Sequence, residues 1–187
     1  MYFPLEDSVF FADFLNRFFK RVDKNKLKKI KVLDMGSGTG ILAENCSFFI
    51  PQKNILCVDI QEDSVNLLKK KGFRAIKSDL FEKISKKEKF DLIIFNAPYL
   101  PLDKREPRDS RIETTGGKKG DEISLRFLRG AFKYLTKDGK IFLLVSSLTP
   151  LDRIKKFKFE IVARKKIPFE ELFILKFENE KTKKSLE

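Results

Sequence analysis

Residues 30–40 read Ile30-Lys31-Val32-Leu33-Asp34-Met35-Gly36-Ser37-Gly38-Thr39-Gly40, and this stretch indicates the fold class. The apolar run from Ile30 to Met35 predicts a short buried strand, which the glycines end. Ile41 to Ile50 is predicted as the following helix, closed by Pro51. Alternating glycines between a strand and a helix let the backbone turn sharply and approach a bound molecule. The sequence therefore predicts one strand-loop-helix unit of an α/β fold.

The rest of the chain alternates between the same two kinds of segment. Strands are predicted at Ile55 to Ile60, Arg74 to Asp79, Phe90 to Phe95 and Ile141 to Val145, and helices at Ser8 to Val22, Glu62 to Lys71 and Asp121 to Leu135. We expect Asp7 or Ser8 to cap the first helix and Asp138-Gly139 to form a turn. This alternation predicts a doubly wound, Rossmann-like sheet that is mainly parallel.

Two more strand candidates lie near the C-terminus. They are Phe159 to Arg164 and Leu172 to Phe177, with Pro168 between them. A hairpin of these segments brings the sheet to seven strands. It also places one antiparallel strand near the C-terminal edge of the sheet.

Length and composition fit one domain, expected over 1–180, with a frayed tail at 181–187. The chain has 187 residues, of which 42% are hydrophobic, enough for one core. Met1 to Val9 contains acidic residues and a proline, unlike a signal peptide, and no stretch approaches the roughly 20 apolar residues that span a bilayer. Cys46 and Cys57 lack paired-motif spacing, and the chain has no histidine to complete a zinc site. We expect a cytoplasmic protein with reduced core thiols, no metal and no membrane contact.

The charge of the chain is strongly positive. The 40 basic and 27 acidic side chains give a formal net charge of +13, which attracts polyanions at long range. The lysine runs are dispersed along the chain, which favours a solvated basic surface. Nucleic acid is therefore permitted as a secondary partner without being required.

The glycine loop contains the candidate cofactor residues Asp34, Gly36, Ser37, Gly38 and Gly40. Its spacing, Gly-x-Gly-x-Gly, differs from the dinucleotide pattern Gly-x-Gly-x-x-Gly. An acid two residues before the first glycine would repel a pyrophosphate but could hold the ammonium of a methionine moiety. The alternative is a tight strand-to-helix turn without a ligand.

Asp59 and Asp79 end the next two predicted strands. Because open parallel sheets bind ligands at the carboxyl ends of their strands, Asp59 could meet ribose hydroxyls. Asp79 could accept a hydrogen bond from an adenine amino group, with Leu80 packed on the ring. The alternative for both acids is capping of a turn or helix. Their occurrence at successive strand ends favours the ligand-binding interpretation.

The motif Asn96-Ala97-Pro98-Tyr99 follows the predicted strand from Phe90. A side-chain oxygen on Asn96 and the Ala97 carbonyl could accept both hydrogens of a planar amide or amino group. Pro98 stiffens the turn, and Tyr99 offers a flat aromatic face. The acceptors would aim the nitrogen and stabilise the positive charge that grows on it, and no general base is needed before transfer. The alternative is an ordinary strand-terminating turn, but together with the glycine loop the motif predicts an N-methyltransferase that uses S-adenosylmethionine.

These motifs resemble class I methyltransferases, and within them the small archaeal and eukaryotic branch of the HemK-type protein glutamine methyltransferases. The motifs that carry the resemblance are Pro4-Leu5-Glu6-Asp7-Ser8, Asp34 to Gly40, Asp59, Asp79-Leu80, Asn96 to Tyr99 and Thr115-Gly116-Gly117. The resemblance implies a substrate, the glutamine of the Gly-Gly-Gln motif in a translation release factor. It also implies that Pro4, Glu6, Asp7 and Ser8 close over substrate and cofactor, with Asn96 and Tyr99 at the target amide. Family members usually have proline where this chain has Ala97, so the turn is expected to be less rigid here.

The resemblance further implies a partner, a small zinc-binding activator protein that covers an apolar surface. The apolar cluster Phe48-Phe49-Ile50 is our candidate for that surface. The expected assembly is a heterodimer.

Other functions remain open from the sequence. An adenine N6-methyltransferase of DNA or RNA would use the same acceptor pair, although only the 22 residues from Tyr99 to Gly120 are available to read a nucleic-acid target. This segment is longer than the usual connection of about 4–6 residues, so we expect it to be functional or disordered.

Lysine methylation needs a base that the motif does not offer. A basic module that binds RNA or protein without catalysis is the alternative from another class, and a nicotinamide-dependent oxidoreductase is disfavoured by the glycine spacing and Asp34.

Overall fold

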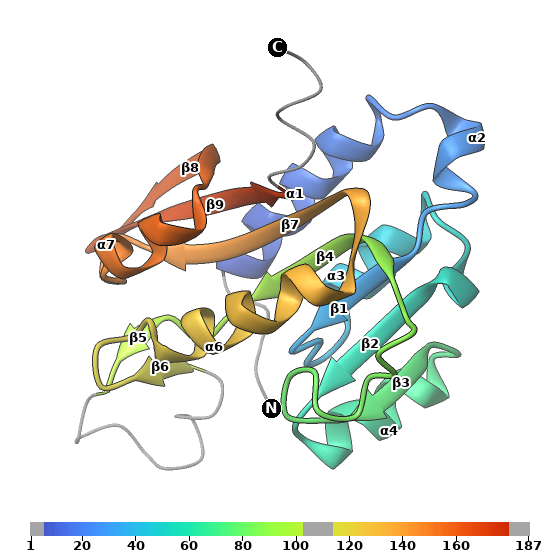
Figure 1. The fold of residues 1–187 in the computed structure, drawn as a ribbon, viewed down its shortest axis with the longest axis horizontal. Coiled ribbons are helices and arrows are strands. Elements are labelled where there is room, and N and C mark those ends of the chain that lie inside the picture. The colour runs from blue at the N-terminus through green and yellow to red at the C-terminus, as the bar shows by residue number, and fades with distance from the viewer. Residues whose placement is uncertain (1–5, 103–113, 180–187) are drawn as a thin grey trace.

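A seven-stranded, mostly parallel sheet forms the centre of the molecule (Figure 1). The computed structural model describes residues 6–102 and 114–179, so Pro4 and the predicted tail at 181–187 lie outside the described residues. The strands lie in the order β3-β2-β1-β4-β7-β9-β8. Only β9 runs antiparallel to its neighbours, one position in from the β8 edge. The predicted α/β, doubly wound architecture is confirmed.

The strands agree with the sequence pattern to within a few residues at most ends. They are β1 (Val32–Met35), β2 (Ile55–Asp59), β3 (Arg74–Lys77), β4 (Phe90–Asn96), β7 (Leu135–Ser146), β8 (Glu160–Ile167) and β9 (Glu170–Glu178). A separate pair, β5 (Leu100–Pro101) and β6 (Thr115–Gly117), lies within the segment for which no strand was predicted. These two strands are too short to show an alternating pattern.

Helices cover both faces of the sheet, on opposite sides in Figure 1. They are α1 (Glu6–Phe19), α2 (Lys24–Leu27), α3 (Ile41–Ser47), α4 (Glu62–Lys70), α6 (Glu122–Ala131) and α7 (Leu151–Ile154), with short 3-10 helices at Gln52–Asn54, Phe132–Tyr134 and Lys155–Phe157. Apolar residues of α1, α3 and α4 share one core cluster with the sheet, and those of α6 and α7 share the other. Within the described ranges, no helix combines the length and apolar character needed to cross a membrane.

Phenylalanine dominates the packing of α1 against the sheet. Phe11, Leu15 and Phe19 are completely buried, and Phe14 packs edge-on against Phe142 of β7 with ring centroids 4.8 Å apart. Burial of each such side chain contributes roughly 1.5–3 kcal/mol. The helix that carries Asp7 and Ser8 is therefore firmly fixed on the sheet.

Glycines set the ends of two helices. Gly40, with φ +92°, is the N-cap of α3, and a Cβ there would lie 2.7 Å from Leu68 Cδ2 of α4, so glycine permits close packing. Gly72, with φ +86°, follows α4 and its C-cap Lys71, where a left-handed backbone conformation favours glycine.

Two local predictions are wrong. Asp7 and Ser8 do not cap α1 from outside, because the helix begins at Glu6 and both residues lie in its first turn. Asp138-Gly139 does not separate a helix from a strand, because β7 continues through it. The pairing with β4 jumps from Phe90↔Leu135 to Leu92↔Lys140, so the intervening residues are accommodated as an irregularity in the strand.

Candidate active site

A cavity of about 560 Å³ opens at the carboxyl ends of β1, β2 and β4. Here β1 has β2 on one side and β4 on the other, and open parallel sheets bind ligands at such a switch point. Predicted site residues that line it are Asp7, Ser8, Asp34, Gly36, Ser37, Gly38, Asp59, Asp79, Leu80, Asn96, Ala97, Pro98 and Tyr99. Glu6 and Gly40 do not line it.

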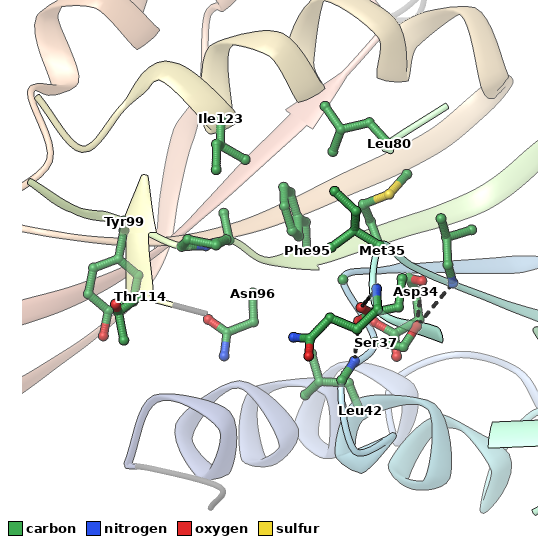
Figure 2. A pocket seen from close by; sticks show the side chains of 18 of the residues that line it. Asp34, Met35, Ser37, Leu42, Leu80, Phe95, Asn96, Tyr99, Thr114 and Ile123 are labelled. Atoms are coloured by element: carbon green, nitrogen blue, oxygen red, sulfur yellow. Dashed lines mark hydrogen bonds between the residues drawn. The ribbon is translucent and has the colours of Figure 1, made fainter. Parts of the chain in front are cut away.

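The cavity has two ends (Figure 2). Tyr99 lies on one side of Asn96, and Asp34 and Ser37 lie on the other. We call residues 34–40 with their surroundings the glycine-loop end, and residues 96–99 with theirs the Asn96 end. The tertiary structure thus brings the two predicted motifs to a single cavity.

Asp34 is the buried acid of the glycine-loop end. It is 1% exposed, and neither carboxylate oxygen has a hydrogen-bond partner of good geometry among the described residues. Burial is the main cause that raises the pKa of Asp34 to about 8, and repulsion from the Asp59 carboxylate is the second. The Ser37 side chain and the Ala43 backbone are nevertheless close enough to lower the pKa of Asp34 somewhat. An ionised carboxylate is unfavourable there without a counter-charge, so a cation bound beside it would stabilise the site. Asp34 therefore fits an ammonium ligand.

The glycine loop turns away from β1 by positive φ angles. A Cβ on Gly36 (φ +61°) would lie 2.9 Å from Phe95 Cε2, whereas one on Gly38 (φ +52°) would meet no atom within 4 Å. Ser37 donates its backbone N–H to the Val58 carbonyl at 3.1 Å, which fixes the loop on β2. Gly36 is needed for packing, and Gly38 leaves the cavity open.

Asp59 supports the loop as well as facing the cavity. Its Oδ2 accepts the Gly38 N–H at 2.8 Å, and its Oδ1 accepts the Gln61 N–H at 2.8 Å. Asp59 therefore caps this turn, as the alternative interpretation of the sequence predicts. Each oxygen retains a further lone pair, which is compatible with the predicted contact to ribose hydroxyls.

Asp79 has a partner that the sequence analysis missed. It forms an ion pair with Arg126 of α6, and both residues line the cavity. Because 47 positions separate them, no local pattern could have revealed the pair. The adjoining Leu80 has φ +47°, a rare conformation for a residue with a side chain, and such outliers cluster at ligand sites.

Asn96 is oriented by the first turn of α1. Its Nδ2 donates to Asp7 Oδ2 at 3.2 Å and to Ser8 Oγ at 3.1 Å. Its Oδ1 is buried and has no hydrogen-bond partner among the described residues. A carboxylate only accepts hydrogen bonds, so Asp7 requires the NH₂ group of Asn96 and leaves the oxygen for another donor.

The backbone after Asn96 is held on two sides. A Cβ on Gly116 would lie 2.6 Å from the Pro98 oxygen and 2.2 Å from the Gly120 oxygen, so only glycine allows this approach. The Thr149 hydroxyl donates to the Tyr99 carbonyl at 3.3 Å. The close approach at Gly116 and the Thr149 hydrogen bond hold the backbone of this turn in place.

The fold and cavity together define a class I methyltransferase. A seven-stranded sheet with β9 antiparallel between β7 and β8 carries a glycine loop with a buried acid, and Asn96 faces the same cavity. The model of the methyltransferase small domain family matches residues 13–170, and the chain belongs to this family.

Similar proteins agree with this class. A protein of Methanocaldococcus jannaschii named protein N5-glutamine methyltransferase is 39% identical over 190 residues, covering 94% of this chain and 90% of that protein. A release factor glutamine methyltransferase of Aliivibrio fischeri is 37% identical over 78 residues, covering 37% of this chain and 27% of that protein.

A solved structure resembles nearly the whole chain. It is the Mtq2–Trm112 complex of E. cuniculi, described as responsible for methylation of the translation termination factor eRF1. The TM-score is 0.71 at 25% identity, with 95% of this chain and 97% of that chain covered.

Proposed function

We propose that this chain is an S-adenosylmethionine-dependent N-methyltransferase that modifies a protein of the translation machinery. Its proposed substrate is the glutamine of the Gly-Gly-Gln motif in a peptide chain release factor, methylated on the side-chain amide. The observation that carries this proposal is the unpartnered, buried Asn96 Oδ1 at the cavity. The names of the similar proteins support the substrate, and a cytoplasmic location follows from it.

The glycine-loop end fits the cofactor. Asp34 supplies a buried carboxyl group that a bound ammonium would hold in its ionised form, and Gly38 leaves open space beside it. We assign Asp34 to the ammonium, Asp59 to the ribose, and Asp79 with Leu80 to the adenine. When bound, S-adenosylmethionine supplies an electrophilic methyl group on a sulfonium.

The Asn96 end fits the acceptor amide. Asn96 Oδ1 and the Ala97 carbonyl would accept the two hydrogens of the target nitrogen, while Tyr99 packs on the planar group. An amide lone pair is delocalised, so holding both hydrogens favours the tetrahedral geometry that the reaction needs. The same oxygens would stabilise the positive charge on nitrogen while the N–C bond forms and the bond between the sulfonium sulfur and the methyl carbon breaks, leaving a neutral thioether. The nitrogen then gives up one proton, and no base is required before transfer.

The decisive experiment is mass spectrometry of a release factor after incubation with cofactor and enzyme. We expect one methyl group on the Gly-Gly-Gln glutamine with the wild type and its loss with Asn96→Ala. The matched control is Asn66→Ala, an exposed asparagine of α4 outside the cavity. An unmodified glutamine after reaction with the wild type, while it binds the cofactor, would reject the proposed substrate.

The same assay separates the alternatives. Adenine methylation remains a candidate because Asn96 and Ala97 suit an exocyclic amino group and the net charge is +13. Labelled methyl groups in DNA, RNA or a lysine, but not in the release factor, would reverse the assignment. Failure to bind S-adenosylmethionine at high micromolar concentration would favour a non-catalytic binding module.

We also propose a heterodimer with a small zinc-binding activator protein. The Mtq2–Trm112 complex is the resembling assembly. Of the three residues predicted to form the apolar surface, Phe48 is 82% exposed and fits that role. Ile50 is buried in the core, so the prediction is wrong for this residue. Phe49 packs on Phe19, with ring centroids 5.3 Å apart. Co-expression should raise the yield and melting temperature of the wild type, and Phe48→Ser should weaken copurification. A stable, fully active chain without affinity for the activator would contradict this assembly.

A further inference from the structure

Glu170 is an acid in the cavity wall that no motif singled out. It is the first residue of β9 and lines the cavity. Its Oε2 is buried, and across residues 6–102 and 114–179 no group forms a hydrogen bond with it. A buried carboxylate oxygen without a donor is unfavourable unless a ligand supplies one.

The strand register places Glu170 near the Asn96 end. Asn96 pairs with Leu144 of β7, which pairs with Ile174, so Glu170 lies beyond this level at the carboxyl edge of the sheet. Side chains alternate along a strand, and Leu172 and Ile174 belong to the core cluster on the α1 side. Glu170 therefore faces the side that α1 covers.

Asn96 reaches the same side by the same alternation. Leu92 and Ile94 of β4 also belong to the cluster on the α1 side, so Asn96 follows them to that face. There it meets Asp7 of α1 at 3.2 Å. Asp7, Asn96 and Glu170 thus lie on one face, at one edge of the sheet.

The number of donors on the target limits what Glu170 can bind. A primary amide has two hydrogens on its nitrogen, and the Asn96 oxygen and the Ala97 carbonyl already account for both. We infer that Glu170 Oε2 accepts a main-chain N–H of the substrate peptide beside the methylated residue. This inference rests on the proposed function and names a positioning residue of the same site.

The sign of the charge favours peptide over nucleic acid. Asp7 and Glu170 make two carboxylates in this part of the cavity, although the chain as a whole carries +13. A carboxylate accepts a peptide N–H but repels a phosphodiester. Glycines before the target would let the peptide backbone reach Glu170 without a side chain between them.

Steady-state kinetics with a release factor domain and the full-length enzyme test this inference. Glu170→Ala should raise KM for the release factor about 10-fold or more, the effect expected for a hydrogen bond to a charged group. The kcat and the Kd for S-adenosylmethionine should change less than about 2-fold, because the target amide and the cofactor keep their contacts. Glu170→Gln keeps an acceptor oxygen, so its KM for the release factor should lie close to the wild-type value.

The control is Glu171→Gln at the next residue of β9, which strand alternation places on the opposite face together with Phe173 and Leu175. Wild-type methylation of the release factor together with an unchanged KM in Glu170→Ala would overturn the role of Glu170 and leave the proposed function intact. Equal losses of kcat and cofactor affinity in both Glu170 variants would also overturn it. If the wild type methylates RNA and not the release factor, both the proposed function and this inference fail.

Discussion

Asn96 at the end of β4 donates its side-chain amide to Asp7 in the first turn of α1, 3.2 Å away and 89 positions earlier in the chain. The carboxylate decides which side of the asparagine faces the cavity, since it can accept a hydrogen bond but not donate one. The Asn96 oxygen is thereby left for the substrate. The helix that begins the described structure thus takes part in the geometry of a motif at the centre of the sheet.

Asp7→Asn is expected to lower kcat while leaving cofactor binding intact. An asparagine at position 7 can present either oxygen or NH₂, so Asn96 is no longer held in one orientation. We expect kcat to fall about 10- to 100-fold, as for a misplaced reacting group, with less than about 2-fold change in the Kd for S-adenosylmethionine. Asp13→Asn, an exposed acid on the same helix, is the control. Equal kcat in the two variants would contradict the orienting role.

The affinity for S-adenosylmethionine should be greatest near pH 8. Burial, with the Asp59 charge, raises the pKa of Asp34 to about 8. Below this pH the carboxyl group must lose a proton to meet the ammonium, and above it an α-amino group, with a pKa of roughly 7.7–8.0, loses its own. Affinity should therefore fall on both sides, by up to about 10-fold per pH unit.

Calorimetry in buffers of different ionisation enthalpy measures the linked protons. The wild type should release a proton on binding below pH 8 and take one up above it. Asp34→Asn should bind weakly and lose the proton release, while uptake at high pH remains. Proton release by this variant equal to that of the wild type would show that another group titrates.

Asp34 should also make the unliganded protein less stable as pH rises. The folded state, with a pKa near 8, keeps a proton that the unfolded chain, with a value of 3.8, has already lost. The contribution of Asp34 to the free energy of unfolding is therefore full below about pH 4 and declines up to about pH 8. Denaturant titrations of wild type and Asp34→Asn should show a difference that grows over this range in favour of the variant. A constant difference would contradict the raised pKa.

Gly38→Ala should abolish cofactor binding with only moderate loss of stability. Gly38 and Gly72 both have positive φ, so alanine strains either backbone by roughly 1–2 kcal/mol. Only at position 38 does the added Cβ enter the cavity, since Gly72 faces Gln52, outside the cavity, at 3.5 Å. Melting curves should be similar for the two variants, while calorimetry should detect S-adenosylmethionine binding only to Gly72→Ala. Normal binding by Gly38→Ala would place the cofactor elsewhere.

Neither cysteine should react in the native protein. Cys46 and Cys57 are free and fully buried, and burial, with the Asp34 charge as a further cause, raises the pKa of both thiols. Thiolate is the reactive form, so alkylation by iodoacetamide at pH 8 should be very slow. Mass spectrometry should find two adducts per chain after unfolding in guanidinium and none before. Rapid native labelling at one position would show that its helix or strand opens.

The course of the main chain was largely predictable. The run from Ile30 to Met35, the glycines after it and the helix that follows are local signals, because strand pattern and positive φ depend on adjacent residues. The strand pairing of Phe159 to Arg164 with Leu172 to Phe177 could be predicted for the same reason. The turn prediction at Asp138-Gly139 is wrong, because a turn signal can also be absorbed as an irregularity within a paired strand.

The contacts between distant residues were not predictable. Asp7 was expected as a helix cap or substrate ligand, and its bond to Asn96 appears only when α1 packs on the sheet beside β4. The same holds for Arg126 beside Asp79, and for Glu170, which enters the cavity only because β9 lies next to β7.

The amino-acid order alone determined the α/β architecture and the two motifs that meet at the cavity, since both arise from short-range periodicity and backbone conformation. Tertiary structure decided the orientation of Asn96, the partner of Asp79 and the presence of Glu170 in the same wall. Those relationships depend on which strands become neighbours in the sheet and which helix covers them. Long-range packing establishes that arrangement, and no neighbouring stretch of sequence encodes it.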